Sequence, residues 1–351
     1  MLFCTDACCE RFPQTRYMGS KRKLLGFLSE IFSSLEFDSA LDPFCGTGSV
    51  AYLLKCMKKK ITASDALQFN AVAARALIEN SEVRLKDTLN SIIDDLPQIG
   101  VELGIVERLF DELFFEREEN RFIDQAITRI NSLDGYKRDL ALYSLFQACL
   151  AKRPYNLFHR ANLYMRRKDV SRSFGNKATW DRPFDVHMKH FAAEADKAVF
   201  DSGRPCKVLC QKIEDVNPDG VDLVYLDPPY ISGSGTGVDY LDFYHFLEGL
   251  CEPDKWEQNI LHRYKHKPLV GKGDSPWADA ARIDAVFEET IKKFADSTLV
   301  ISYRSEGFPS IDDITGYMKK AGKKVSIVDA GKYTYALSRN KKSREIVLVG
   351  R

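Results

Sequence analysis

The spacing of apolar residues in the first quarter of the chain alternates between two patterns. Short apolar runs at 39–42 and 61–64 predict β-strands, and the second run ends at Asp65. Apolar residues recur at helical spacing around these runs, which predicts helices over 21–36, 50–57 and 71–78. A strand, a glycine-containing turn, a helix and a second strand in this order indicate the beginning of an α/β sheet.

The middle of the chain has a different character from its two ends. Residues 85–150 combine helical periodicity with many charges, and residues 151–190 are basic, rich in aromatic residues and Asn, and weakly periodic. Further strands are predicted at 207–210, 222–226, 298–302, 324–330 and 345–349, with helices over 279–295 and 312–321. We therefore expect an α/β, Rossmann-like core formed by residues 1–84 and 205–351, with a mostly helical domain inserted over 85–204.

Charge is distributed unevenly along a chain of ordinary globular composition. The 351 residues are 44% apolar and 29% charged, and the formal net charge is +1. Residues 152–189 hold ten Lys and Arg against three Asp and Glu, and residues 317–351 hold ten against two. Such concentrations of positive charge can bind phosphate groups, although a plain solvated surface would have the same composition.

The chain has no sequence feature of a membrane or secreted protein. No apolar run reaches the roughly 18 residues of a membrane span, and the N-terminus lacks the basic and apolar segments of a signal peptide. Nine scattered Cys favour a reducing cytoplasm over a disulfide framework. Cys4, Cys8 and Cys9 lack a usual zinc spacing, so no metal site is predicted. We expect a cytoplasmic protein without membrane contact.

The first candidate site is the segment Asp42-Pro43-Phe44-Cys45-Gly46-Thr47-Gly48, between a predicted strand and a helix. Gly46 and Gly48 allow a sharp turn and a close approach of the backbone to a ligand. The third glycine of the dinucleotide fingerprint is absent, which argues against a dehydrogenase. Asp42 is unsuited to a pyrophosphate but suits a positively charged ligand. Asp65, at the end of the next strand, is expected to bind ribose hydroxyls, with a helix N-cap as the alternative.

The second candidate site is Asp227-Pro228-Pro229-Tyr230, which follows a buried apolar strand. The prolines stiffen the turn and remove backbone donors. Asp227 and the Pro228 carbonyl can then accept both hydrogens of an exocyclic amine, which directs its lone pair towards an electrophile. Tyr230 offers a ring face for a planar base. The alternative is a strand-ending turn that happens to contain proline.

These motifs resemble those of Dam-like adenine-specific DNA methyltransferases, in which the cofactor motif precedes the recognition domain and the catalytic motif follows it. Tyr17-Met18-Gly19-Ser20-Lys21 looks like that family's N-terminal motif, and the segments 338–339 and 342–346 also look familial. The resemblance covers about 220 residues at the two ends of the chain. Where the family often has an acid that meets the cofactor's adenine, this chain has Gln211-Lys212-Ile213, with Glu214 and Asp215 later.

The resemblance implies a Rossmann-like methyltransferase core that binds S-adenosylmethionine, releases S-adenosylhomocysteine and requires no metal. It implies that Tyr17 and Lys21 line the methionine end of the cofactor, together with Asp42, Pro43, Phe44, Gly46, Gly48, Asp65 and Asp227 as its binding site. Asp227, Pro228, Pro229 and Tyr230 would form the catalytic motif for the 6-amino group of an adenine. An amine inside a duplex cannot reach such a site, so the base would be flipped out of double-stranded DNA.

The basic part of the inserted domain is the expected DNA-binding element. Its candidate phosphate or guanine contacts are Arg153, Arg160, Arg166, Arg167, Arg172 and Lys177, and Asn156, Asn162 and Asn176 have the chemistry to read adenine. Trp180 and Tyr155 are expected in the core. A cognate restriction endonuclease is a conceivable partner, and a monomer is the default state.

Three other functions share these features. Methylation of the 4-amino group of cytosine would use the same acceptor pair. RNA methyltransferases more often have Asn in place of Asp227, and the basic insert fits duplex DNA better. A DNA-binding specificity protein with an inactive core would not need Asp42, Asp65, Asp227 and Tyr230 all intact.

Overall fold

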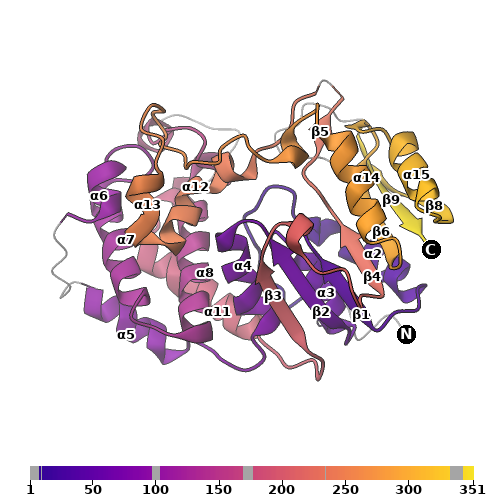
Figure 1. Ribbon diagram of the computed structural model, residues 1–351. Coiled ribbons are helices and arrows are strands. Elements are labelled where there is room, and N and C mark those ends of the chain that lie inside the picture. The colour runs from indigo at the N-terminus through magenta and orange to yellow at the C-terminus, as the bar shows by residue number, and fades with distance from the viewer. Residues whose placement is uncertain (1–7, 9, 97–102, 169–176, 234, 333–342) are drawn as a thin grey trace.

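A seven-stranded sheet with the order β3-β2-β1-β4-β6-β9-β8 runs through one half of the molecule, on the right in Figure 1. The computed structural model describes residues 8, 10–96, 103–168, 177–233, 235–332 and 343–351. The strands are β1 (Ser39–Asp42), β2 (Lys60–Asp65), β3 (Cys206–Cys210), β4 (Leu223–Leu226), β6 (Thr298–Arg304), β8 (Val325–Lys332) and β9 (Arg344–Gly350). Strand β9 runs antiparallel to β6 and β8, whereas the pairs from β3 to β6 are parallel. This sheet confirms the expected Rossmann-like α/β architecture.

Both faces of the sheet are buried because successive side chains of a strand point to opposite sides. In β4, Leu223 and Tyr225 belong to one apolar cluster, and Val224 and Leu226 to the other. The first cluster includes side chains of α2 (Leu25–Ser33), α3 (Ser49–Cys56) and α4 (Gln68–Ala74), and the second those of α14 (Ile283–Lys293) and α15 (Ile311–Lys320). Helices on both faces explain why these strands read as continuous apolar runs in the sequence.

A helical layer lies beyond the β3 edge of the sheet, next to α4 (Figure 1). It contains α5 (Asp87–Asp95), α6 (Ile105–Leu109), α7 (Arg117–Ile130), α8 (Gly135–Ala151), α9 (Tyr164–Arg167), α10 (Lys177–Asp181) and α11 (Phe184–Ala198). Helix α8 packs on α11 and α4, so one apolar cluster continues from the sheet into this layer. Helices α12 (Tyr240–Cys251) and α13 (Pro253–Trp256) return to it after β4, and Phe246 and Trp256 pack against Phe110. The layer therefore includes residues outside the range 85–204.

Smaller features differ from the sequence expectations. The helix predicted over 71–78 is α4 followed by a π-helical turn, Arg75–Glu79. A two-stranded ladder of β5 (Ile231–Ser232) and β7 (Gly307–Phe308) was not predicted. Cys8 and Cys56 form a disulfide, contrary to the expectation of free thiols. The reason is spatial: the N-terminal segment folds back onto α3, where Phe12 packs against Tyr52.

Candidate active site

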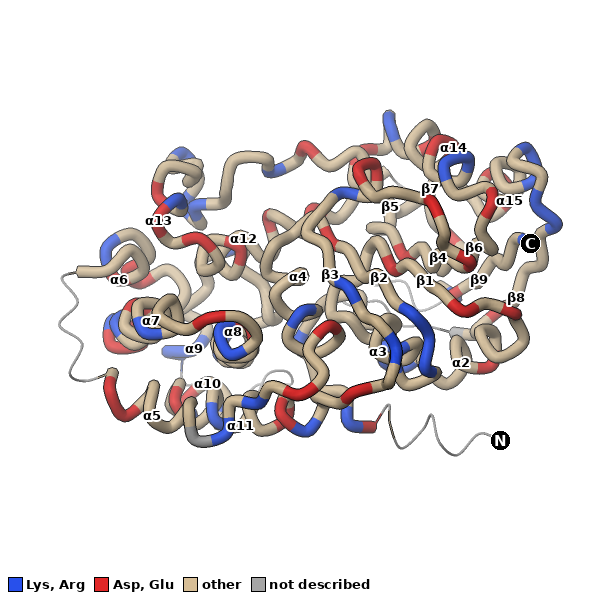
Figure 2. Tube along the Cα trace, turned by 60° about the horizontal axis from the view of Figure 1, so that its bottom comes forward, with Lys and Arg blue, Asp and Glu red and all other residues tan. Residues whose placement is uncertain are grey.

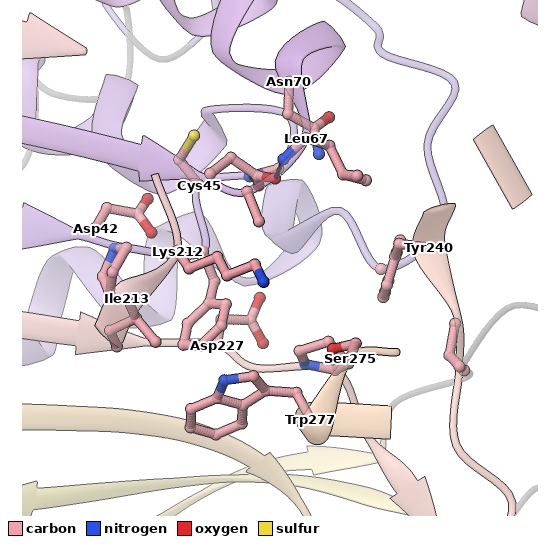
Figure 3. Close-up of a pocket in the computed structure, with 18 of the residues that line it drawn as sticks. Asp42, Cys45, Leu67, Asn70, Lys212, Ile213, Asp227, Tyr240, Ser275 and Trp277 are labelled. Atoms are coloured by element: carbon pink, nitrogen blue, oxygen red, sulfur yellow. Dashed lines mark hydrogen bonds between the residues drawn. The ribbon is translucent and has the colours of Figure 1, made fainter. Parts of the chain in front are cut away.

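A cavity of about 340 Å³ lies at the carboxyl ends of the central strands β1, β2 and β4. In an open α/β sheet, a crevice forms at this edge where the strand order reverses, here between β1 and β4. Residues from three separate sequence motifs line it: Tyr17, Lys21, Asp42, Pro43, Phe44, Gly46, Asp65, Asp227 and Pro229. Figure 3 shows Asp42 and Asp227 beside the same space. Gly48, Pro228 and Tyr230 are not on its wall.

The loop between β1 and α3 forms one side of the cavity. Gly46 (φ +47°) and Gly48 (φ +76°) have left-handed backbone conformations that disfavour residues with a Cβ atom. A Cβ atom at Gly46 would lie 3.3 Å from the ring of Tyr17. The first glycine therefore lets the segment around Tyr17 pack directly over the loop, and the second is the N-cap residue of α3.

Asp65 connects the glycine loop to the next turn. Its Oδ2 accepts a hydrogen bond from the Gly46 amide at 2.9 Å, and its Oδ1 accepts one from the Leu67 amide at 2.9 Å. Burial raises the pKa of Asp65, and these hydrogen bonds partly oppose the rise. These contacts fix the turn that leads into α4, but the capping alternative is wrong. Asp65 accepts no amide of α4, whose first two amides, those of Gln68 and Phe69, donate to Glu248 instead. The ribose-binding role stays a prediction.

Asp42 is a buried carboxylate whose Oδ1 atom has no hydrogen-bond partner among the described residues. Its side chain ends β1 and is 1% exposed. Burial raises the pKa of Asp42 well above its ordinary value, and the carboxylates of Asp227 and Asp65 raise it further. An unsatisfied buried oxygen is energetically costly. The natural complement of Asp42 is therefore a cationic or N–H-donating ligand that enters the cavity.

Helix α12 holds the N-terminal motif in place. The ring of Tyr17 stacks on Tyr244, with 4.8 Å between centroids, and on Tyr240, with 5.7 Å between centroids. The Met18 amide donates to the Tyr244 hydroxyl at 2.8 Å. Tyr240 also lines the cavity (Figure 3). Neither tyrosine of α12 was a candidate site residue, although their spacing of four residues would have placed both rings on one helical face.

Lys21 joins the N-terminal motif to the second candidate motif. Its Nζ atom lies 2.7 Å from Asp227 Oδ1 and donates to the Tyr230 hydroxyl at 2.7 Å. The Tyr230 oxygen is also 2.8 Å from Asp227 Oδ1 and 2.9 Å from Glu345 Oε1. Burial raises the pKa of Asp227, Lys21 lowers it and Glu345 raises it. Glu345 comes from β9. It lies in the segment 342–346, which looks familial, but it was not a candidate site residue.

The orientation of Tyr230 bears on its expected role. Its hydroxyl points into the cluster with Lys21 and Asp227, and its ring makes an edge contact with Tyr303 at 5.1 Å between centroids. The ring face is not part of the cavity wall. Stacking of Tyr230 on a base therefore stays a prediction.

The segment that departs from the Dam-like pattern does border the cavity. Lys212, Ile213 and Glu214 lie on its wall beside Trp277, which had not been a candidate (Figure 3). The Trp277 indole donates to Glu214 Oε1 at 3.3 Å, and its ring meets Phe44 edge-on at 4.9 Å between centroids. This part of the wall combines apolar rings with polar edges, which suits a planar heterocycle.

Arg153 lies inside the helical layer rather than on a DNA-facing surface. It is 1% exposed, and its guanidinium donates to the carbonyls of Leu157 at 3.0 Å and of Arg160 at 2.7 Å. The same group packs over the rings of Phe114 and Phe158. The expectation that Arg153 contacts phosphate does not fit this burial, because its donors already satisfy protein carbonyls.

Acidic residues on and beside α7 pair with much of the predicted basic patch (Figure 2). Arg166 is buried and forms two hydrogen bonds of 2.7 Å with Glu119, which also pairs with Lys152. Arg167 pairs with Glu116 at 2.6 Å but is about half exposed. Counting charges over 152–189 therefore overestimated the free positive charge. Lys177 and Asp181 form a further ion pair, which is exposed, with 3.1 Å between Nζ and Oδ2. The candidates Arg172 and Asn176 lie outside the described residues.

The turn after Arg153 presents a different surface. Tyr155 and Asn156 have left-handed φ values of +62° and +56°, and Tyr155 is 50% exposed, contrary to its expected place in the core. Trp180 is buried as expected, and the candidate Asn162 is also buried. Arg160 is exposed, and its guanidinium forms no ion pair within the described part of the chain. Asn156 and Arg160 are therefore the predicted DNA contacts that share an accessible turn.

Two negative findings concern the described residues alone. Their His, Cys, Asp and Glu side chains form no group of three or more arranged to hold a metal ion. None of their helices combines the length and apolar character that crossing a membrane requires.

Comparison with known proteins identifies relatives over most of the chain. A family model described as D12 class N6 adenine-specific DNA methyltransferase matches residues 17–278. The chain is 24% identical over 328 residues to the type II methyltransferase M2.HphI of Haemophilus parahaemolyticus, with 91% of each chain covered. It is 22% identical over 328 residues to the type II methyltransferase M.NlaIII of Neisseria lactamica, with 88% of each covered. Type II methyltransferase M.FokI of Planomicrobium okeanokoites is 23% identical, but the match covers 47% of that protein.

Proposed function

Because the chain belongs to the family of D12 class N6 adenine-specific DNA methyltransferases, we propose that the cavity at the carboxyl ends of β1, β2 and β4 is its active site. The protein is an enzyme that methylates the 6-amino group of adenine in DNA. The observation that carries the proposed site is the meeting of Asp42 and Asp227, from distant motifs, on one cavity wall. The family match also favours adenine over the cytosine alternative.

The residues present fit S-adenosylmethionine, the methyl donor that a methyltransferase family implies. The unpaired Oδ1 atom of Asp42 would receive a positively charged part of the cofactor, and Tyr17 and Lys21 would line its methionine end. Gly46 keeps the loop close to the cavity, and Asp65 borders the proposed ribose position. When bound, the cofactor supplies an electrophilic methyl group on its sulfonium. The proposed binding site also includes Pro43 and Phe44 on the cavity wall and Gly48 in the loop before α3.

Asp227 and Pro228 are proposed to prepare the adenine amine. The amine is a poor nucleophile because its lone pair is delocalised into the ring. Asp227 and the Pro228 carbonyl would accept its two hydrogens and so turn the lone pair towards the electrophile. Pro229 keeps the turn rigid, and Tyr230 would provide the ring against which the flipped base rests. The base would then lie close to Lys21, because the Tyr230 hydroxyl accepts a hydrogen bond from Lys21.

Residues 85–204 are proposed as the target-recognition domain, with α12 and α13 packed onto it. The turn that carries Tyr155, Asn156 and Arg160 is its best-supported contact surface, because these side chains are at least partly accessible. The half-exposed Arg167 and the exposed Lys177 could contact phosphates if DNA replaces their acidic partners.

The two arginines at the ends of this turn should respond differently to substitution. Arg160→Ala is expected to weaken DNA binding and to reduce the salt dependence of binding by about one counterion, without loss of stability. Arg153→Ala should cost on the order of 3 kcal/mol of folding free energy, since buried carbonyls lose a charged donor. Thermal unfolding and DNA titrations at several salt concentrations measure both effects. Normal stability of Arg153→Ala would contradict its assigned structural role.

Cofactor binding is expected to release protons. Burial and neighbouring carboxylates raise the pKa of Asp42, so part of the empty protein carries a proton there at pH values where a free aspartate is ionised. A cationic ligand favours the ionised form, so affinity should increase with pH until deprotonation is complete. Calorimetric titration in buffers of different ionisation enthalpy measures the released protons. Heats that are independent of the buffer would contradict this coupling.

The biological setting is proposed from the relatives. Several of them are named type II methyltransferases, which supports a Dam-like modification enzyme that acts on double-stranded DNA. We also propose that it acts as a monomer in the cytoplasm. A cognate restriction endonuclease would recognise the same short sequence. Size-exclusion chromatography with light scattering measures the molar mass with and without a DNA duplex and so tests whether the protein is a monomer.

Methyl transfer from labelled S-adenosylmethionine to unmethylated plasmid DNA tests the function directly. Digestion to nucleosides should place the label in 6-methyladenine, and mapping should find it within one short sequence. Label in 4-methylcytosine would overturn the substrate base. Label in RNA but not in DNA would overturn the DNA specificity.

A further inference from the structure

Strand β9 brings a carboxylate to the active site that neither motif contains. Glu345 is the second residue of β9, and its side chain is 0% exposed. Its Oε1 atom lies 2.9 Å from the Tyr230 hydroxyl and 3.4 Å from Lys21 Nζ. Burying a carboxylate is unfavourable unless charged or hydrogen-bonding partners compensate it. Two of its close partners are themselves residues of the proposed active site.

The hydrogen bonds of this cluster limit what Asp227 can accept. Lys21 has three N–H donors, whereas the Tyr230 hydroxyl has a single proton. That proton can be donated to Asp227 Oδ1, at 2.8 Å, or to Glu345 Oε1, at 2.9 Å, but not to both. The Lys21 ammonium likewise lies near two carboxylates, 2.7 Å from Asp227 Oδ1 and 3.4 Å from Glu345 Oε1. Glu345 thus competes with Asp227 for the same donors.

Building on the proposed function, we propose that Glu345 is a positioning residue that engages Lys21 and Tyr230 and thereby leaves Asp227 able to accept the adenine amine. Without Glu345, the Tyr230 hydroxyl would lose one of its two carboxylate acceptors and Lys21 one of its two carboxylate neighbours, so both would interact more strongly with Asp227. Its oxygen would then be a weaker acceptor for a further hydrogen bond. Glu345 acts through these two residues and is not assigned any contact with the substrate.

The charged surroundings give this proposal a measurable signature. Asp227 is faced by Lys21 before α2, Asp42 at the end of β1, Tyr230, and Glu345 on β9. Glu345 itself is paired across the ladder with Arg304 of β6, and it influences Tyr225 of β4. Since Glu345 raises the pKa of Asp227, a neutral side chain at 345 should lower it. The pH below which Asp227 becomes protonated would then fall.

Glu345→Gln is the informative variant because it keeps the shape of the side chain and removes its charge. We expect kcat for methyl transfer to fall about 10- to 100-fold, with the dissociation constant of S-adenosylmethionine changed by less than about threefold. The acidic limb of the kcat–pH profile should move to lower pH. Glu345→Asp, which retains the charge, should keep the acidic limb near its wild-type position.

A control variant separates positioning from stability. Asp124 is another buried carboxylate, 5% exposed, which accepts the amides of Val106 and Glu107 at the start of α6. Asp124→Asn should lower the unfolding temperature without moving the acidic limb. Wild-type kcat and an unmoved limb in Glu345→Gln would overturn the positioning role. Absence of methyl transfer by the wild-type protein would instead overturn the proposed function, and the inference with it.

Discussion

Replacing Asp227 with alanine is expected to reduce methyl transfer by about a thousandfold or more. Asp227 follows β4 directly and is the charged half of the acceptor pair proposed for the adenine amine. In the alanine variant, the Pro228 carbonyl would be the remaining acceptor of the proposed pair. Lys21 would keep Glu345 as a nearby carboxylate. Affinity for S-adenosylmethionine should change by less than about threefold, because Asp42 and the glycine loop are untouched.

Single-turnover transfer from labelled cofactor and equilibrium cofactor binding measure the two quantities. Asp222→Asn is a matched control, because Asp222 directly precedes β4 whereas Asp227 directly follows it. Asp222 Oδ2 accepts the amides of Asp38 and Ser39, away from the cavity, so its loss should lower stability and leave the transfer rate unchanged. Near-normal turnover by Asp227→Ala would remove Asp227 from the proposed mechanism.

The strands around the site could be predicted because each is a short apolar run that ends in a polar, conformationally demanding turn. The expected range 39–42 coincides with β1. The range 61–64 is one residue shorter than β2 at each end, and 222–226 begins one residue before β4. Buried parallel strands produce this pattern without reference to the rest of the fold. The cavity between Asp42 and Asp227 follows from the strand order, which local sequence does not specify.

Helix α12 and the segment around Trp277, which complete the cavity wall, have no such local signal. Helix α12 was not predicted, and with it Tyr240 and Tyr244 were missed. Trp277 lies between α13 and α14 in a segment without regular apolar spacing. Tyr240 and Trp277 reach the cavity wall through tertiary packing, and Tyr244 contributes through its stacking on Tyr17.

The basic insert illustrates a different limit of sequence reasoning. Arg153 and Arg166 were expected to contact DNA because they lie in a basic stretch, but the one satisfies buried carbonyls and the other pairs with Glu119. Glu119 is more than 40 residues earlier in the chain. Whether an arginine is free depends on partners of this kind, so net charge in a window is a poor guide to a nucleic-acid surface.

Asp42→Asn is expected to weaken S-adenosylmethionine binding about 10- to 100-fold while stabilising the empty protein. The carboxylate is buried, its Oδ1 atom has no partner within the described structure, and burial together with Asp227 and Asp65 raises its pKa. In the empty protein this charge is unfavourable, so a neutral amide of the same shape should raise the unfolding midpoint by about 2 °C. With the cofactor present, the same charge would be the main attraction for its cationic groups.

Thermal unfolding with and without S-adenosylmethionine separates these opposing effects. At saturating cofactor, the wild-type protein should gain more stability than Asp42→Asn, because the gain depends on the ratio of ligand concentration to dissociation constant. The uncharged end of the cofactor provides a further comparison: adenosine should bind both proteins with similar affinity. An unchanged dissociation constant for S-adenosylmethionine in Asp42→Asn would show that Asp42 does not receive the cation. A lower unfolding midpoint of the empty variant would show that Asp42 is a structural carboxylate, whose buried charge the fold needs even without a ligand.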